Sequence, residues 1–220
     1  MPQNDASQSS AKAPLSQDAI LSKAMQIADE EGLENLSVRK LAKALDRTAM
    51  ALYRHFDSMA VIQQGLIALA FSEVDTVPIP GERWDDTIRR TTASIRQMHL
   101  NHANAHLHLA EGAAWGPGLR DHTERVQRLH RDQGIPEDIL MRAWRIIDAF
   151  LTGFIANEIG EMEHHADATE VSERPTWLET AAGAYSEQSF HDGIDIIIEG
   201  IRGLAAPDPC EWRTPLEGER

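Results

Sequence analysis

The segment from residue 37 to residue 56, SVRKLAKALDRTAMALYRHF, constrains the fold of this 220-residue chain more than any other part. Ser37 can cap a helix, because its hydroxyl can accept a hydrogen bond from a free backbone N–H two or three residues later. Apolar residues then recur at helical spacing as far as Leu45, with basic residues on the other faces. The periodicity stops at Asp46, a residue type that tolerates the left-handed backbone of a tight turn. These features predict a short helix that ends in a turn.

A second short helix is predicted directly after this turn. Thr48 can cap it, and Ala49, Leu52 and Phe56 fall on one face. Two helices joined in this way form a helix-turn-helix, whose second helix fits the major groove of DNA. Residues 37–56 carry five Lys or Arg and one acid, a net charge of +4, whereas the whole chain carries −14. A basic segment on an acidic protein is typical of a surface that binds phosphate.

The run LSVRKLAKALDRTAMALYRHF resembles the DNA-binding segment of the TetR family of transcriptional regulators, including its LYRHF ending. The resemblance extends upstream through AILSKAMQIADEEGLENLSV, which is similar to the family's first helix and the glycine turn that closes it. It covers roughly residues 15–70. The resemblance implies a ligand-responsive regulator, most often a repressor, that binds a palindromic operator as a homodimer and is released by a small-molecule effector.

Composition sets the compartment that we expect. The single Cys210 excludes an internal disulfide framework, so a reducing compartment is the default. No run approaches the roughly 18 apolar residues of a membrane-spanning helix, so we expect no membrane partner. Residues 1–14 are rich in Ser, Gln and Ala and predict a disordered arm rather than a signal peptide. The predicted location is the cytoplasm.

Hydrophobic periodicity predicts an all-α chain with two parts. We predict a helix-turn-helix head over residues 15–75, which includes a connecting helix, and a ligand-binding and dimerisation body over residues 81–206. Two prolines between residues 77 and 81 mark the boundary, because neither fits inside a helix. The predicted body helices cover residues 84–101, 103–115, 119–133, 136–161 and 186–204. Residues 164–177 are predicted to form a loop, and residues 207–220 a loose tail.

The long helix and the last helix of the body have apolar faces wider than an isolated body requires. Pairing them with the same helices of a second copy would bury these faces in a four-helix interface across a twofold axis. The resemblance to the TetR family implies the same pairing. We therefore predict a homodimer.

Ten residues are predicted to contact double-stranded operator DNA. Arg39 aligns with a family position that often reads a base, and Arg pairs bidentately with guanine. Ala49 and Met50 occupy the family's recognition positions, where apolar side chains read only shape and thymine methyl groups. Tyr53 and His55 match the family's phosphate-contacting aromatic residue and histidine. The complete predicted set is Ser37, Arg39, Lys43, Arg47, Thr48, Ala49, Met50, Tyr53, Arg54 and His55.

Three positions depart from the family pattern. Asp46 stands where the turn usually has glycine, which adds backbone strain and places an acid near phosphate. Arg47 replaces an apolar residue, which indicates a phosphate contact in place of core packing. Met59 replaces a lysine at the start of the connecting helix, so one backbone contact to DNA is missing. We expect these changes to weaken or retune DNA binding rather than abolish it.

The body is rich in histidine and aromatic residues. His102 and His106 are four residues apart, a spacing at which two imidazoles on one helix can share a metal. A polar histidine face, or single histidines that hydrogen-bond a ligand, explains them better, because no HExxH or CxxC motif is present. We predict no metal, no cofactor and no catalytic residue. The residues predicted to line an apolar effector site are Met98, His102, His106, Trp115, Trp144, Phe150, Phe154 and Trp177.

A different class of function stays open on the sequence alone. The chain could be a helical metal- or ligand-binding protein, or an enzyme, that uses the body histidines and has no DNA function. No nucleophile elbow, phosphate-binding loop or metal-ligand motif supports this alternative.

Overall fold

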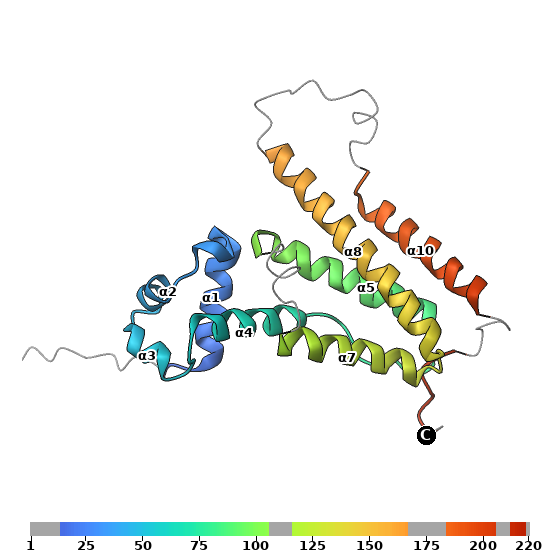
Figure 1. Cartoon of the computed structure of the whole chain (residues 1–220), viewed down its shortest axis with the longest axis horizontal. Helices are drawn as coiled ribbons and strands as arrows, with labels where there is room; N and C mark the ends of the chain where they lie inside the picture. Colours follow the sequence, from blue (N-terminus) through green and yellow to red (C-terminus); the bar gives the residue numbers. More distant parts are fainter. Residues whose placement is uncertain (1–13, 106–115, 167–183, 206–211, 219–220) are drawn as a thin grey trace, which may run out of the picture.

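The computed structural model describes residues 14–105, 116–166, 184–205 and 212–218. Within these ranges the chain is all-α, as predicted, and the only extended pairing is an isolated antiparallel bridge between Arg83 and Arg213. Figure 1 shows the elements. They are α1 (Gln17–Glu31), η1 (Leu33–Asn35), α2 (Val38–Ala44), α3 (Ala49–Tyr53), α4 (Met59–Phe71), α5 (Trp84–Asn101), η2 (Ala103–Ala105), α7 (Pro117–Asp132), α8 (Glu137–Ala166) and α10 (Glu187–Leu204).

Side-chain caps begin all four helices of the head. The hydroxyls of Ser16, Ser37, Thr48 and Ser58 accept hydrogen bonds from the backbone N–H three residues later, at 3.1 to 3.3 Å. Each cap of this kind stabilises a helix by about 1 kcal/mol. The predicted caps at Ser37 and Thr48 are confirmed. Local chemistry therefore fixes where α2 and α3 begin.

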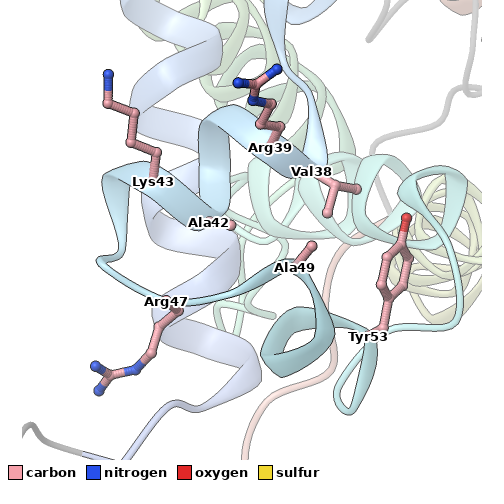
Figure 2. A pocket seen from close by; sticks show the side chains of 7 residues that line it. All are labelled: Val38, Arg39, Ala42, Lys43, Arg47, Ala49 and Tyr53. Carbon is pink, nitrogen blue, oxygen red and sulfur yellow. The ribbon is translucent and has the colours of Figure 1, made fainter.

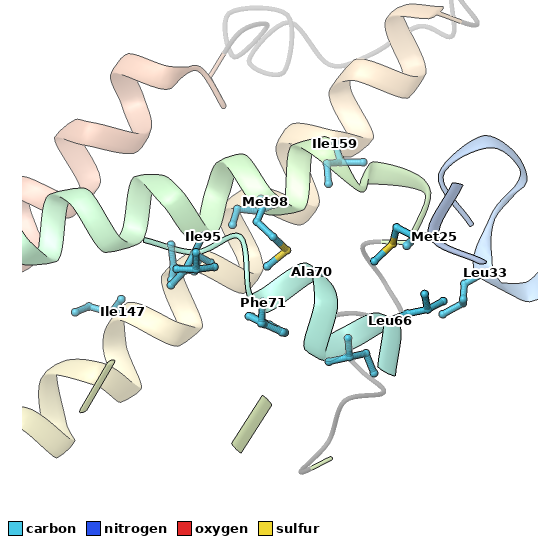
Figure 3. Packing of buried hydrophobic residues seen from close by; sticks show 14 of the residues in the cluster. Met25, Leu33, Leu66, Ala70, Phe71, Ile95, Met98, Ile147 and Ile159 are labelled. Carbon is cyan, nitrogen blue, oxygen red and sulfur yellow. The ribbon is translucent and has the colours of Figure 1, made fainter. Parts of the chain in front are cut away.

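Helix α4 joins the head to the body through one continuous core. Figure 3 shows its residues Leu66, Ala70 and Phe71 between Met25 of α1 and Met98 of α5. Helix α7 lies alongside α4 in Figure 1 and packs closely against it. A Cβ atom added at Gly118 of α7 would lie 2.7 Å from the Cα atom of Ala68. Because the two backbones meet without a side chain between them, a shift of α7 must move α4.

The body is built on α5, α8 and α10, which pack against one another. Arg96 of α5 and Glu158 of α8 form an ion pair in which Nε lies 2.8 Å from Oε2. The guanidinium of Arg96 also lies 5.4 Å from the ring centre of Phe190 of α10, a cation–π contact. One charged residue thus ties the three helices together.

The structure corrects several predicted boundaries. Helix α3 ends at Tyr53 rather than Phe56, and α4 ends at Phe71 rather than at residue 75. Helix α8 continues to Ala166, so residues 164–166 are helical rather than part of a loop. Of the helix predicted over residues 103–115, Ala103–Ala105 form a 3-10 turn, and the rest lies outside the described residues.

The predicted loose tail is wrong for residues 212–218. The N–H of Gly81 donates to the carbonyl of Thr214 at 2.9 Å, and the N–H of Thr214 donates to the carbonyl of Glu82 at 2.9 Å. The N–H of Trp84 donates to the carbonyl of Trp212, and the two indole rings pack edge to face at 5.8 Å. The tail therefore pairs with the chain that enters α5.

Candidate nucleic-acid interface

The turn between α2 and α3 adopts the backbone that the sequence indicated. Asp46 has a φ of 51°, the only positive φ of a non-glycine residue in the described chain. The N–H of Arg47 donates to the carbonyl of Ala42 at 2.9 Å, which closes the end of α2. A left-handed non-glycine residue costs roughly 1–2 kcal/mol. The predicted departure from glycine at Asp46 is thus a real source of strain in the motif.

The two helices bury one face and expose the other. Leu41 and Leu52 are fully buried at 0% and 1% exposure, so they fix the packing of the motif on the rest of the head. The outer face has a cleft of about 420 Å³ lined by Val38, Arg39, Ala42, Lys43, Arg47, Ala49 and Tyr53. Figure 2 shows the long side chains of this set around the small ones, Val38, Ala42 and Ala49. The cleft has cations at its margin and an apolar floor.

Of the ten residues predicted to contact DNA, five line this cleft, namely Arg39, Lys43, Arg47, Ala49 and Tyr53. Eight of the ten are exposed, while Arg47 and His55 are half-buried. Met50 is 71% exposed, so its apolar side chain is accessible to a partner. Ser37 and Thr48 use one lone pair in their caps and keep a hydroxyl proton that a phosphate could accept.

Two contacts organise the rim of this surface. Lys40 of α2 forms an ion pair with Glu31 at the end of α1, so its charge is directed toward the protein. The amide of Gln17 donates to the carbonyl of His55 at 2.9 Å and ties the end of α3 to the start of α1. Sequence reasoning did not single out Gln17, because its partner lies 38 residues away.

Comparison with known proteins identifies the family. The family described as "Bacterial regulatory proteins, tetR family" matches residues 20–63. The "Tetracyclin repressor-like, C-terminal domain" matches residues 77–204, which is more than half of the chain. The chain belongs to the TetR family. This TetR-family protein is a ligand-responsive, DNA-binding transcriptional repressor, and members of the family are regulators rather than enzymes.

Relatives of this regulator match over most of its length. The tetracycline repressor protein class E of Escherichia coli is 29% identical, and the match covers 93% of this chain and 98% of the relative. The HTH-type transcriptional repressor DrrR1 of Streptomyces coeruleorubidus is 25% identical, covering 89% and 83% of the two chains. The structure of the Streptomyces coelicolor TetR family protein ActR with (S)-DNPA has a TM-score of 0.66 and 26% identity, covering 88% and 100%.

The predicted effector residues that the structure describes pack in different parts of the core of the TetR-family body. Phe150 and Phe154 lie 5.3 Å apart and pack against Phe190. Trp144 instead packs against His130 at 5.6 Å, and Met98 is buried in the core. The predicted residues His106, Trp115 and Trp177 lie outside the described residues.

His102 is already engaged within the chain. Its Nδ1 lies 2.8 Å from a carboxylate oxygen of Asp29, and its Nε2 lies 3.1 Å from one of Glu73. An effector or metal could reach either ring nitrogen only by displacing a carboxylate. Among the described residues, no group of three His, Cys, Asp or Glu is arranged to hold a metal ion.

Two buried histidines of α7 were missed by sequence reasoning. His122 Nδ1 and His130 Nε2 have no hydrogen-bond partner among the described residues. Burial lowers the pKa of each ring to about 4, so both are neutral at pH 7. His122, Val126, Leu129 and His130 share one helical face, and this spacing could have placed both rings inside.

None of the described helices has the length and hydrophobicity that crossing a membrane requires.

Proposed function

We propose that this TetR-family repressor acts as a cytoplasmic homodimer that binds a palindromic operator and is released by a small-molecule effector. The observation that carries the proposal is the exposed cationic cleft on α2 and α3. Its cations would bind phosphates, and its exposed apolar residues would face base edges. We propose no catalytic role for any residue.

Each predicted DNA residue has a role in this scheme. Arg39 reads a guanine, and Ala49 and Met50 contact thymine methyl groups and the shape of the groove. Phosphate contacts come from the remaining polar residues, which set the register on the duplex without reading its sequence. These residues are Ser37, Lys43, Arg47, Thr48, Tyr53, Arg54 and His55.

The outer faces of α8 and α10 support the homodimer. Ile146 of α8 is 55% exposed and Ile196 of α10 is 73% exposed. Nothing lies within 4 Å of a Cβ atom built at four glycines of these helices, so the backbones are open to close approach by a second copy. These glycines are Gly153, Gly160, Gly200 and Gly203.

The effector site that we propose lies where α4, α5 and α7 meet. His122 of α7 packs on Phe71 of α4 with ring centres 4.7 Å apart, and His99 of α5 contacts the same ring at 6.2 Å. The three rings are buried, and an effector that enters between them would meet apolar ring faces and the Nδ1 of His122, which has no hydrogen-bond partner among the described residues. Such a site suits a small molecule with an apolar body and one polar group. The names of relatives, a tetracycline repressor and a protein solved with (S)-DNPA, support a small-molecule effector.

Release requires the effector to favour an arrangement that binds DNA less well. An effector at Phe71 would act on the last turn of α4. Because Gly118 packs directly on Ala68, movement of α7 would also reach α4. Helix α4 would then change the distance between the two α3 helices of the dimer, which must match the spacing of successive major grooves.

Selection of genomic DNA fragments by the purified protein tests the proposal. We expect enrichment of a palindromic sequence, and Arg39→Ala should weaken binding to it by about tenfold or more, equivalent to roughly 1–3 kcal/mol. Arg128→Ala, at an exposed position of α7, is the matched control and should bind as the wild type does. Equal affinity of the Arg39→Ala and wild-type proteins would refute the recognition scheme.

A further inference from the structure

His102 lies at the junction of the head and the body. It follows the last residue of α5, and its N–H donates to the carbonyl of Met98 at 3.2 Å. Its side chain is 8% exposed, so the ring is enclosed by the surrounding elements. Three parts of the chain meet there: α1 of the head, the segment that follows α4, and the end of α5.

The two partners of the ring come from different parts of this junction. Asp29 belongs to α1, and Glu73 follows the end of α4. A neutral imidazole has one N–H donor, so it can satisfy only one of two carboxylates, and its other nitrogen then faces an acceptor with a lone pair. The imidazolium donates from both nitrogens. Only the protonated ring can therefore join Asp29 to Glu73.

The charges around the ring favour its protonated form. Burial disfavours the cation, but the hydrogen bonds to Asp29 and Glu73 outweigh it and raise the pKa of His102 above its ordinary value. The charged groups that face the ring are Asp29 from α1 and Glu73 after α4, and the uncharged Asn104 of η2 bonds the backbone of Asp29. The stabilisation is complete below about pH 6.5, the ordinary histidine pKa, and is lost as pH rises through the higher folded pKa.

Helix α1 connects this junction to the helix-turn-helix. Helix α1 packs against both α2 and α4. Asn104 adds a second contact from the body, since its amide donates to the carbonyl of Asp29 at 2.5 Å. A change at Asp29 therefore reaches the base of the helix-turn-helix through a packed helix.

We propose that His102 is a positioning residue for DNA binding, a proton-controlled latch that joins the head to the body at Asp29 and Glu73. Below neutral pH the latch holds the head in the arrangement described above. At higher pH one of its two bonds is lost, and the head gains freedom relative to the body. Its effect on DNA rests on the function proposed above, whereas the latch itself does not.

Hydrogen exchange without DNA tests the latch directly. Amide protection across residues 25–31 is compared at pH 6 and pH 8 in the wild type and in His102→Gln, after correction for intrinsic exchange. We expect the wild type to lose protection about fivefold or more at pH 8 and the variant to change little. Asn104→Ala, which keeps the ring and both carboxylates, should retain the wild-type pH response. The same pH response in His102→Gln as in the wild type would overturn the latch.

Binding to the duplex selected from genomic DNA tests the effect on the head. His55 is one of the residues proposed to contact phosphate, so the comparison is made between His55→Gln and His55→Gln/His102→Gln. We expect the first protein to bind about fivefold more tightly at pH 6 than at pH 8, and the second to show a markedly smaller ratio. Equal ratios would overturn the role in DNA binding. Failure to select any duplex would instead refute the proposed function. The hydrogen-exchange experiment needs no DNA, so it would still test whether His102 joins the head to the body.

Discussion

At a few positions between the head and the body, the packing is so close that it restricts which side chain can be present. Gly118 is one such position, because the backbone of α4 lies where a side chain would be. His122 of α7 is another, since its ring packs on Phe71 of α4 and its Nδ1 has no hydrogen-bond partner among the described residues. At this scale the fold is sensitive to a single methyl group or a single proton.

Gly118→Ala is expected to destabilise the protein. The added methyl group would lie 2.7 Å from Ala68, and overpacking of this kind costs about 1–3 kcal/mol, partly offset by the better helix propensity of alanine. Asp121→Ala, at an exposed position of the same helix, is the control and should change stability little. Urea unfolding provides the measurement. An unchanged or increased free energy of unfolding would show that α4 and α7 can move apart to accommodate the methyl group without loss of stability.

His122 should make the protein sensitive to acid. Its pKa is about 4 in the folded protein and near 6.5 when unfolded, so the unfolded chain binds protons more readily and stability falls as pH drops from 6.5 to 4. The loss reaches on the order of 3 kcal/mol at pH 4. His122→Phe should reduce the difference in unfolding free energy between pH 7 and pH 4, while His191→Gln, on the partly exposed face of α10, should not. If the unfolding free energies of His122→Phe and the wild type depend on pH in the same way, His122 is not the source of the acid sensitivity.

At the scale of elements, the C-terminal segment 212–218 acts as a clasp on the start of α5. Gln133, at the end of α7, donates to the hydroxyls of Thr87 at 2.6 Å and Thr214 at 3.2 Å. Thr214 is only 3% exposed, although only six residues follow it in the sequence. The clasp thus joins α5, α7 and the chain terminus through one buried amide.

A chain that ends at residue 210 should be less stable than the full chain. It loses three backbone hydrogen bonds to residues 81–84 and the packing of Trp212 on Trp84, a loss of roughly 2–4 kcal/mol. A chain that ends at Gly218 keeps every one of these contacts and is the control. The difference between the melting temperatures of the two truncated proteins measures what residues 211–218 contribute to stability. Equal melting temperatures would show that the clasp contributes nothing to stability.

At the scale of the whole molecule, the proposed dimer has to hold its two heads at one spacing. One continuous core runs from α1 through α4 to α5, and Figure 3 shows part of its packing. The proposed pairing of α8 and α10 would then set the distance between the two α3 helices. Dimerisation and DNA binding should fail together.

Ile196→Glu should convert the protein to a monomer. The side chain is 73% exposed, so the substitution should leave the fold of one protomer intact, whereas a charge would be buried at the proposed interface. Val77→Glu, at a 67% exposed position between head and body, is the matched control and should remain dimeric. Sedimentation velocity gives the mass of each protein. An Ile196→Glu protein that stays dimeric would place the interface elsewhere.

The sequence by itself determined the features that depend on neighbouring residues. The caps at Ser37 and Thr48, the left-handed Asp46 and the extent of α5 were all predicted, because capping, turn formation and helical periodicity act over a few residues. The all-α class and the helix-turn-helix follow from the same local rules.

Only the tertiary structure decided the contacts between distant segments. The clasp of residues 212–218, the enclosure of His102 by Asp29 and Glu73, and the packing of Trp144 on His130 could not be predicted. Each depends on which faces of the helices meet, and this is set by packing of the whole core rather than by local periodicity. The sequence around His102 fits an exposed polar histidine as well as a buried one that pairs with carboxylates. Only the positions of α1 and α4 beside the ring distinguish the two.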